Sequence, residues 1–289
     1  MYTLEEFYSE YPIQRMNLEN SVFSYRYYKN PDAEATLVLL TGGTGFSDLL
    51  YQHFKQFTQK FSVITFDYQL QYMNIDDFLE SVSAVLKELE EKVWLVGQSL
   101  GGFIAQIFAK EYPDQVEGMI LSNTGSLSAD MSKEAYDSLL YMMKLQRKMK
   151  VLVNSLPFPI YKKIIEKMLL DKKKMEGYSE DEKRIMEDMG YMIISLMDKP
   201  YENHMIDMML DLENHFGMKP EDFAYLEKRV LLMLSSDDKT FHEDVKKSLT
   251  DLMTGAELEE DMQGGHLALL FRLDEYVEKV SQFIEKAQG

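Results

Sequence analysis

The amino-acid sequence predicts an α/β fold, a doubly wound and mostly parallel sheet with one inserted helical segment. Two observations predict this fold class. First, short apolar segments typical of strands alternate with segments whose apolar residues recur at helical spacing. Strands without a polar face belong to a sheet covered on both sides, which is typical of parallel strands joined by crossover helices. Second, the alternation stops near residue 126 and resumes near residue 226, which indicates an insertion.

The first 125 residues contain the strand and helix patterns of such a sheet. The first strand-like segment alternates between apolar and polar residues, and the second is continuously apolar. The strand-like segments are residues 22–28, 36–40, 61–66, 93–96 and 116–121. One amphipathic helix is expected after Asn74, a suitable N-cap, and another that carries Leu100 must end before Pro113.

The middle of the chain, residues 126–225, is compatible with helices and contains no segment typical of a strand. It holds 14 of the 21 methionines, and residues 144–174 contain ten basic and two acidic residues. Strand and helix patterns then return at residues 229–234, 241–253 and 273–284. We therefore expect an α/β core formed by residues 1–125 and 226–289, and a helical cap formed by residues 126–225.

Composition restricts the partners that the protein can have. With 31 Lys and Arg against 49 Asp and Glu, the net charge is -18, which repels nucleic acid and anionic membrane surfaces overall. The absence of cysteine excludes disulfides and thiolate catalysis and fits a reducing compartment. No secretory signal pattern or apolar run of about 18 residues is present, so a cytoplasmic protein without a membrane span is expected. We expect neither a cofactor nor a metal.

A candidate nucleophile lies between the strand at residues 93–96 and the helix after it. Ser99 is flanked by Gly97 and Gly101, the positions at which a sharp strand-to-helix turn needs glycine. Such a turn raises the serine hydroxyl above the carboxyl edge of the sheet, next to the N–H groups that begin the helix. The N–H of Leu100 is then the first candidate donor to a developing oxyanion.

A second glycine-rich loop, Thr41 to Gly45, follows the strand at residues 36–40. A loop in this position can supply the second oxyanion donor, for which we expect the N–H of Gly43 or of its neighbour Thr44. A phosphate-binding loop is the alternative, but the spacing and the lysine of a P-loop are absent, as is a full dinucleotide-binding fingerprint.

Candidates for a base and its orienting carboxylate occur late in the chain. Asp237 and Asp238 follow the strand at residues 229–234. Asp238 is favoured because three residues separate it from the end of the strand, as a side chain that reaches the site would need. Both aspartates could instead cap the next helix. Of the five histidines, His266 follows two glycines that would let a loop carry it to the sheet edge, whereas His242 is interpreted as a helix residue.

With these motifs, the sequence resembles the α/β-hydrolase superfamily over its whole length except the insertion. The resemblance implies a triad of Ser99, Asp238 and His266, with oxyanion donors at Leu100 and Gly43, and an acyl-enzyme mechanism. Since the base must be a neutral imidazole, activity is expected to fall below roughly pH 6.5. Three features depart from the common pattern: Thr41, Ser235 and the segment 67–70, which lacks a glycine-rich loop.

The expected activity is hydrolysis of a carboxylic ester, and cleavage of thioesters, lactones or carbon–carbon bonds is an alternative that uses the same triad. The first half also resembles maspardin-like members, so a catalytically weak binding or scaffold protein is a second hypothesis. A haloperoxidase-like or acyltransferase activity, seen as acyl transfer to acceptors other than water, is a third. The methionines of the insertion either fill the space between its helices or form an adaptable apolar surface over the site, and the second interpretation would suit a hydrophobic small-molecule acyl substrate. The basic run is interpreted as a solvated helix face or a docking face, and a homodimer is left open.

Overall fold

A single sheet forms the centre of the protein in the computed structural model, which describes residues 2–19, 21–171 and 175–288. In these ranges eight strands follow the order β1-β2-β4-β3-β5-β6-β7-β8. β1 pairs with β2 and β2 with β4 in antiparallel fashion, and all the other pairs are parallel. The strands are β1 (Gln14–Asn17), β2 (Val22–Tyr28), β3 (Thr36–Leu40), β4 (Ser62–Thr65), β5 (Val93–Gln98), β6 (Val116–Ser122), β7 (Val230–Met233) and β8 (Glu257–Glu259). The predicted fold class is confirmed.

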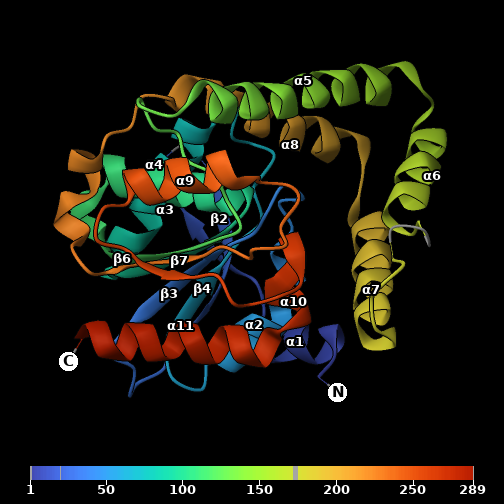
Figure 1. Ribbon diagram of the computed structural model, residues 1–289. Helices are drawn as coiled ribbons and strands as arrows, with labels where there is room; N and C mark the ends of the chain where they lie inside the picture. Colours follow the sequence, from blue (N-terminus) through green and yellow to red (C-terminus); the bar gives the residue numbers. More distant parts are fainter. Residues whose placement is uncertain (1, 20, 172–174, 289) are drawn as a thin grey trace.

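Helices cover both faces of the sheet (Figure 1), which explains why its central strands have no polar face. One face packs against α3 (Ile75–Glu88), α4 (Leu100–Glu111) and α9 (Glu243–Leu252). The other face packs against α1 (Leu4–Glu10), α2 (Tyr51–Phe57) and α11 (Leu273–Gln288). Successive residues of β3 belong alternately to the two apolar clusters, as the alternation of side chains along a strand requires.

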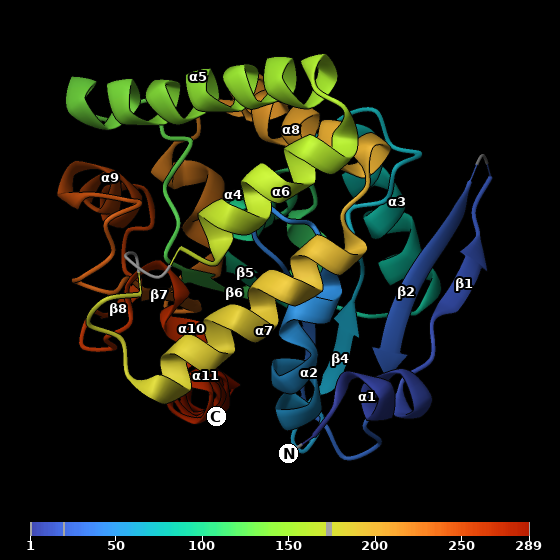
Figure 2. The ribbon, with the colours of Figure 1, turned by 90° about the vertical axis from the view of Figure 1, so that its right-hand side faces the viewer.

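Four longer helices follow β6 in the sequence and precede β7, and in space they lie outside the sheet (Figure 2). They are α5 (Lys133–Ser155), α6 (Phe158–Leu169), α7 (Glu180–Leu196) and α8 (Lys199–Asp211). Helix α5 packs against α8 and α6 packs against α7, around a small apolar cluster of their own. Three lysines of the basic run, residues 172–174, lie outside the described residues.

Short helices complete the chain between these elements. They are η1 (Ser47–Leu50), η2 (Pro113–Gln115), η3 (Leu212–His215), η4 (Pro220–Leu226), η5 (Gly265–Leu267) and α10 (Ala268–Phe271). Over the residues that the structure describes, no helix is long and apolar enough to cross a membrane.

Among the elements that the sequence patterns do not predict are α1, α2, β1 and β8, and one prediction is wrong. β1 and β8 are short edge strands with mostly exposed side chains, and α1 buries only Phe7, so none of them has a clear apolar period. His242 does not lie within a helix. Its backbone is extended and it is the N-cap residue of α9, which begins at Glu243 with an acidic first turn.

Candidate active site

The turn between β5 and α4 holds Ser99 in an unusual backbone conformation. Its φ of 53° lies in the left-handed region, which residues other than glycine rarely adopt. A Cβ on Gly97 would lie 2.3 Å from the carbonyl oxygen of Gly101, and one on Gly101 would lie 2.2 Å from that of Leu40. Both glycines are therefore required by close backbone contacts, as the sequence pattern indicated.

Ser99 and His266, far apart in the chain, lie within hydrogen-bonding distance. Nε2 of His266 is 3.1 Å from Oγ of Ser99, and Nδ1 is 3.0 Å from Oδ2 of Asp238. The side chain of Asp238 is fully buried, whereas that of His266 is 24% exposed. A carboxylate in this position accepts a hydrogen bond from Nδ1–H, which keeps the imidazole proton on Nδ1. Nε2 is then free to accept the hydroxyl proton of Ser99.

The two candidate aspartates have different partners. The second oxygen of Asp238, Oδ1, accepts a 2.7 Å hydrogen bond from the N–H of Thr240, so both carboxylate oxygens are fixed. The carboxylate of Asp237 instead accepts hydrogen bonds from the N–H groups of Gly264 and Gly265, at 3.2 and 2.9 Å. Asp238 therefore faces the imidazole, and Asp237 holds the loop that carries it.

Asn123, at the end of β6, connects the aspartate loop to the histidine loop. Its Nδ2 donates to the carbonyl of Gly265 at 2.8 Å and to Oγ of Ser235 at 3.1 Å, and its Oδ1 accepts from the N–H of Ser235 at 2.8 Å. Asn123 is buried, with a φ of 41° that asparagine tolerates better than most residues. Buried Lys246 also donates to the carbonyl of Ser235, at 2.7 Å.

Sequence reasoning missed Asn123, although a polar residue directly after an apolar strand was a signal for it. It also gave no role to Gln98, the residue before the candidate nucleophile. Nε2 of Gln98 donates to the carbonyl of His266 at 3.2 Å and lies 3.4 Å from its Nε2. A Cβ on Gly42 would come within 2.5 Å of Oε1 of Gln98, so a larger residue there would displace the end of this side chain.

The expected oxyanion donors lie on two segments beside Ser99. Leu100 is the first residue of α4, and Gly43 lies in a turn closed by a 3.0 Å hydrogen bond from the N–H of Gly45 to the carbonyl of Gly42. In the described part of the chain, neither the N–H of Leu100 nor that of Gly43 donates a hydrogen bond. Both residues line a cavity together with Ser99.

This cavity is small and almost entirely apolar. Its volume is about 70 Å³, and α5 and α8 contribute the methionines that cover it. Its lining consists of Gly43, Ser99, Leu100, Phe103, Leu127, Leu139, Met142, Met143, Met209, Leu212 and Phe241. No charged side chain is among these residues. A ligand that reaches Ser99 in this conformation must therefore be small and uncharged at the buried end.

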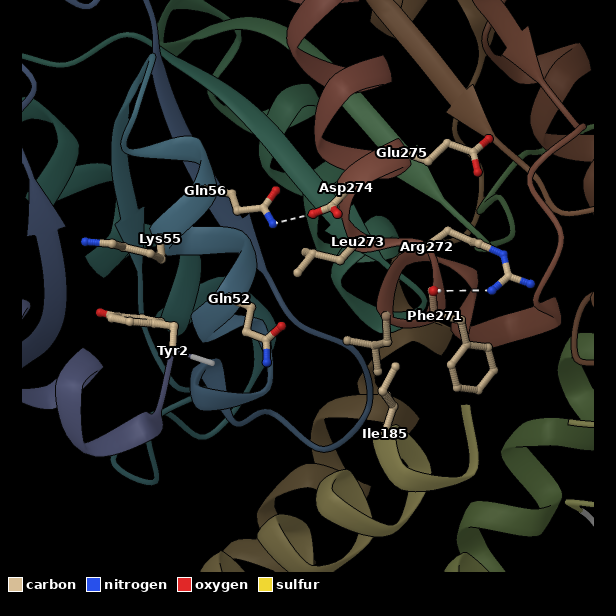
Figure 3. A pocket seen from close by; sticks show the side chains of 11 residues that line it. Tyr2, Gln52, Lys55, Gln56, Ile185, Phe271, Arg272, Leu273, Asp274 and Glu275 are labelled. Carbon is tan, nitrogen blue, oxygen red and sulfur yellow. Dashed lines mark hydrogen bonds between the residues drawn. The ribbon is translucent and has the colours of Figure 1, made fainter. Parts of the chain in front are cut away.

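A much larger hollow, of about 700 Å³, lies elsewhere and contains none of these residues. Figure 3 shows Gln56 of α2 and Asp274 of α11 joined across it, and Ile185 of α7 at its edge. An ion pair of 2.9 Å between Arg272 and Glu182 connects α7 to the core beside it. Its lining mixes charged and apolar side chains, and none of Ser99, Asp238 and His266 is among them, so this hollow is separate from the small cavity at Ser99.

No cluster of three or more His, Asp or Glu side chains suited to a metal ion occurs among the described residues.

Comparison with known proteins identifies the family. A model of the alpha/beta hydrolase fold matches residues 35–273, which is most of the chain. The protein therefore belongs to the α/β-hydrolase fold family, and the resemblance seen in the sequence is confirmed.

Solved structures of the same fold come from several organisms. A hydrolase from Pseudomonas aeruginosa has a TM-score of 0.72 at 15% identity, with 94% of this chain and 98% of that one covered. A thermophilic esterase from Thermogutta terrifontis has a TM-score of 0.70 at 16% identity, with 96% and 100% covered. An enol-lactonase from Burkholderia xenovorans has a TM-score of 0.69 at 15% identity, with 94% and 100% covered. Identities this low establish a shared fold only.

Proposed function

We propose that the protein is a serine hydrolase that cleaves a carboxylic ester or a related acyl compound through an acyl-enzyme on Ser99. The observation that carries this proposal is the continuous hydrogen-bonded series from Ser99 through His266 to Asp238, with distances of 3.1 and 3.0 Å. A serine in a strained turn, hydrogen-bonded to an imidazole whose other nitrogen faces a buried carboxylate, has the arrangement of an activated nucleophile.

In the proposed mechanism, His266 removes the hydroxyl proton of Ser99 as its Oγ attacks the acyl carbonyl. The N–H groups of Leu100 and Gly43 stabilise the oxyanion, and the protonated imidazole then gives its proton to the departing alcohol. Water, deprotonated by the same imidazole, attacks the ester on Ser99, and the imidazolium then returns this proton to Oγ as the acid is released. Asp238 keeps the proton of the neutral imidazole on Nδ1 throughout and stabilises the imidazolium.

The cavity supports a short, uncharged acyl group as the substrate. Its volume of about 70 Å³ is well below that of pockets that enclose drug-sized molecules, and its lining offers no partner to a charged group. Thioesters and lactones fit the same chemistry. The structurally similar esterase and enol-lactonase agree with this range of substrates but do not narrow it.

Labelling by a fluorophosphonate probe tests the proposal directly, because the probe reacts only with an activated serine. We expect labelling of the wild type, none of Ser99→Ala, and strongly reduced labelling of His266→Ala. The same proteins should show the same order of activity on p-nitrophenyl acetate and butyrate. A folded wild type that neither reacts with the probe nor hydrolyses these esters would contradict the proposal.

The second candidate is a catalytically weak protein that binds a ligand on the same fold. One observation favours it, namely that the methionines of α5 and α8 leave little open volume above Ser99. In that case a hydrophobic ligand should bind equally well to wild type and Ser99→Ala, and fluorophosphonate labelling should be absent.

A further inference from the structure

Helix α6 exposes apolar side chains and lysines on one face. Ile160 and Ile164 are 50% and 36% exposed and lie one turn apart, and the exposed Lys163 and Lys167 lie beside them. The opposite side of the helix faces the other helices and buries Tyr161 completely. The exposed isoleucines are therefore not part of the stripe that holds α6 in place.

The second half of α5 repeats this arrangement. Tyr141, Leu145 and Val151 are 60%, 39% and 67% exposed, and the exposed Lys144 and Lys148 lie between them on the same face. The inner face of the same helix contributes residues that line the cavity at Ser99. α5 thus has one apolar face turned to the site and a second, mixed face turned to solvent.

We define these nine residues as the α5–α6 surface: Tyr141, Lys144, Leu145, Lys148, Val151, Ile160, Lys163, Ile164 and Lys167. Among the residues with described positions, none of its four lysines forms an ion pair, and the surface contains no acidic residue. The rest of the molecule is strongly acidic, since the net charge of the whole chain is -18. In Figure 1, α5 and α6 meet at an outer corner of the molecule.

We propose that the α5–α6 surface binds to an anionic lipid surface, with its apolar side chains in the interface and its lysines among the phosphate headgroups. Exposed apolar residues with lysines beside them are typical of helices that lie at a membrane interface, because lysine stems follow the apolar surface while their charges reach the headgroups.

The negative net charge does not oppose this binding mode. Charges separated by more than about 8 Å are largely screened at physiological salt, so the lysines nearest the lipid determine the local attraction. A lysine at an anionic bilayer strengthens binding about fivefold. The proposal does not depend on the chemistry of Ser99 and can be tested on Ser99→Ala as well as on the wild type.

Flotation with lipid vesicles tests the proposal on the full chain. We expect the wild type to float with phosphatidylcholine vesicles that contain about 30% phosphatidylserine, and not with phosphatidylcholine alone. The variant Lys144→Gln/Lys148→Gln/Lys163→Gln/Lys167→Gln should bind about a hundredfold more weakly or worse, because each lysine at the headgroups contributes about fivefold. Its matched control, Lys60→Gln/Lys87→Gln/Lys92→Gln/Lys286→Gln, removes four exposed lysines elsewhere and should bind like the wild type.

A second pair of variants tests the apolar contribution. Ile160→Ser/Ile164→Ser should weaken flotation, whereas Leu70→Ser/Met73→Ser, at positions that are 47% and 81% exposed, should not. Circular dichroism and hydrolysis of a soluble p-nitrophenyl ester show that each variant is folded.

Two results would overturn the proposal. The first is a wild type that does not float with the anionic vesicles at low salt, or that floats no better than the four-lysine variant. The second is retention on immobilised polyglutamate, lost in that variant, without any binding to vesicles. This second result would assign the α5–α6 surface to an acidic protein partner.

Discussion

Removal of the Asn123 side chain tests whether the contact between the two loops positions the imidazole. Asn123→Gly deletes three hydrogen bonds, of 2.8, 3.1 and 2.8 Å, that tie Ser235 and Gly265 together, while glycine tolerates the φ of 41°. Asn123→Ala deletes the same bonds and adds strain, because alanine disfavours the left-handed region by roughly 1 kcal/mol. A comparison of the two variants therefore separates the contribution of the lost hydrogen bonds to the free energy of unfolding from that of backbone strain.

The expected loss of stability follows from the groups left without partners. Loss of the side chain leaves the buried N–H of Ser235 and the half-buried carbonyl of Gly265 without a partner, and a fully buried group left in this way costs about 1–3 kcal/mol. We expect Asn123→Gly to lower the free energy of unfolding by about 3 kcal/mol, and Asn123→Ala to lower it by roughly 1 kcal/mol more. Urea denaturation measures both values.

Catalysis should respond differently from stability. If Asn123 positions the loop of His266, kcat should fall by about tenfold to a hundredfold in both variants, and by a similar factor in each. KM should change little, because Asn123 is not among the residues that line the cavity. A kcat within about twofold of the wild type in a folded Asn123→Gly would refute the positioning role, since the contact would then be merely structural.

Four further predictions follow from the same structure. Burial lowers the pKa of His53 from 6.5 to about 4. The unfolded chain therefore binds the additional proton between these values, and stability falls as pH decreases from 6.5; at pH 5 the loss is about 2 kcal/mol, and thermal melts of His53→Gln should show a smaller loss. Asp238→Asn should lower kcat by about a thousandfold or more while the protein stays folded; an unchanged kcat would exclude Asp238 as the orienting group. Gly101→Ala should destabilise by about 3 kcal/mol in denaturant titrations, because its Cβ would lie 2.2 Å from the carbonyl oxygen of Leu40. Met143→Ala should raise kcat/KM for hexanoate and octanoate esters relative to acetate, and an unchanged ratio would show that this methionine does not limit the acyl group.

The amino-acid sequence alone predicts six of the eight strands, β2 to β7, and the local geometry around Ser99. Continuous apolar segments reveal buried parallel strands because the pattern is set by a few neighbouring residues. The need for glycine at positions 97 and 101 can also be predicted from the sequence, because the close backbone contacts that require it belong to the turn itself. The edge elements α1, β1 and β8 escaped prediction because they bury too few side chains to produce a period.

The contacts between distant segments are seen in the folded structure alone. It placed Asp238, rather than its neighbour Asp237, against the imidazole, and it revealed Asn123 as the link between two loops more than a hundred residues away from it. It also set the size of the cavity through methionines from α5 and α8. These contacts depend on packing between segments that are distant in the sequence. The hydrophobic periodicity within each segment therefore does not predict them.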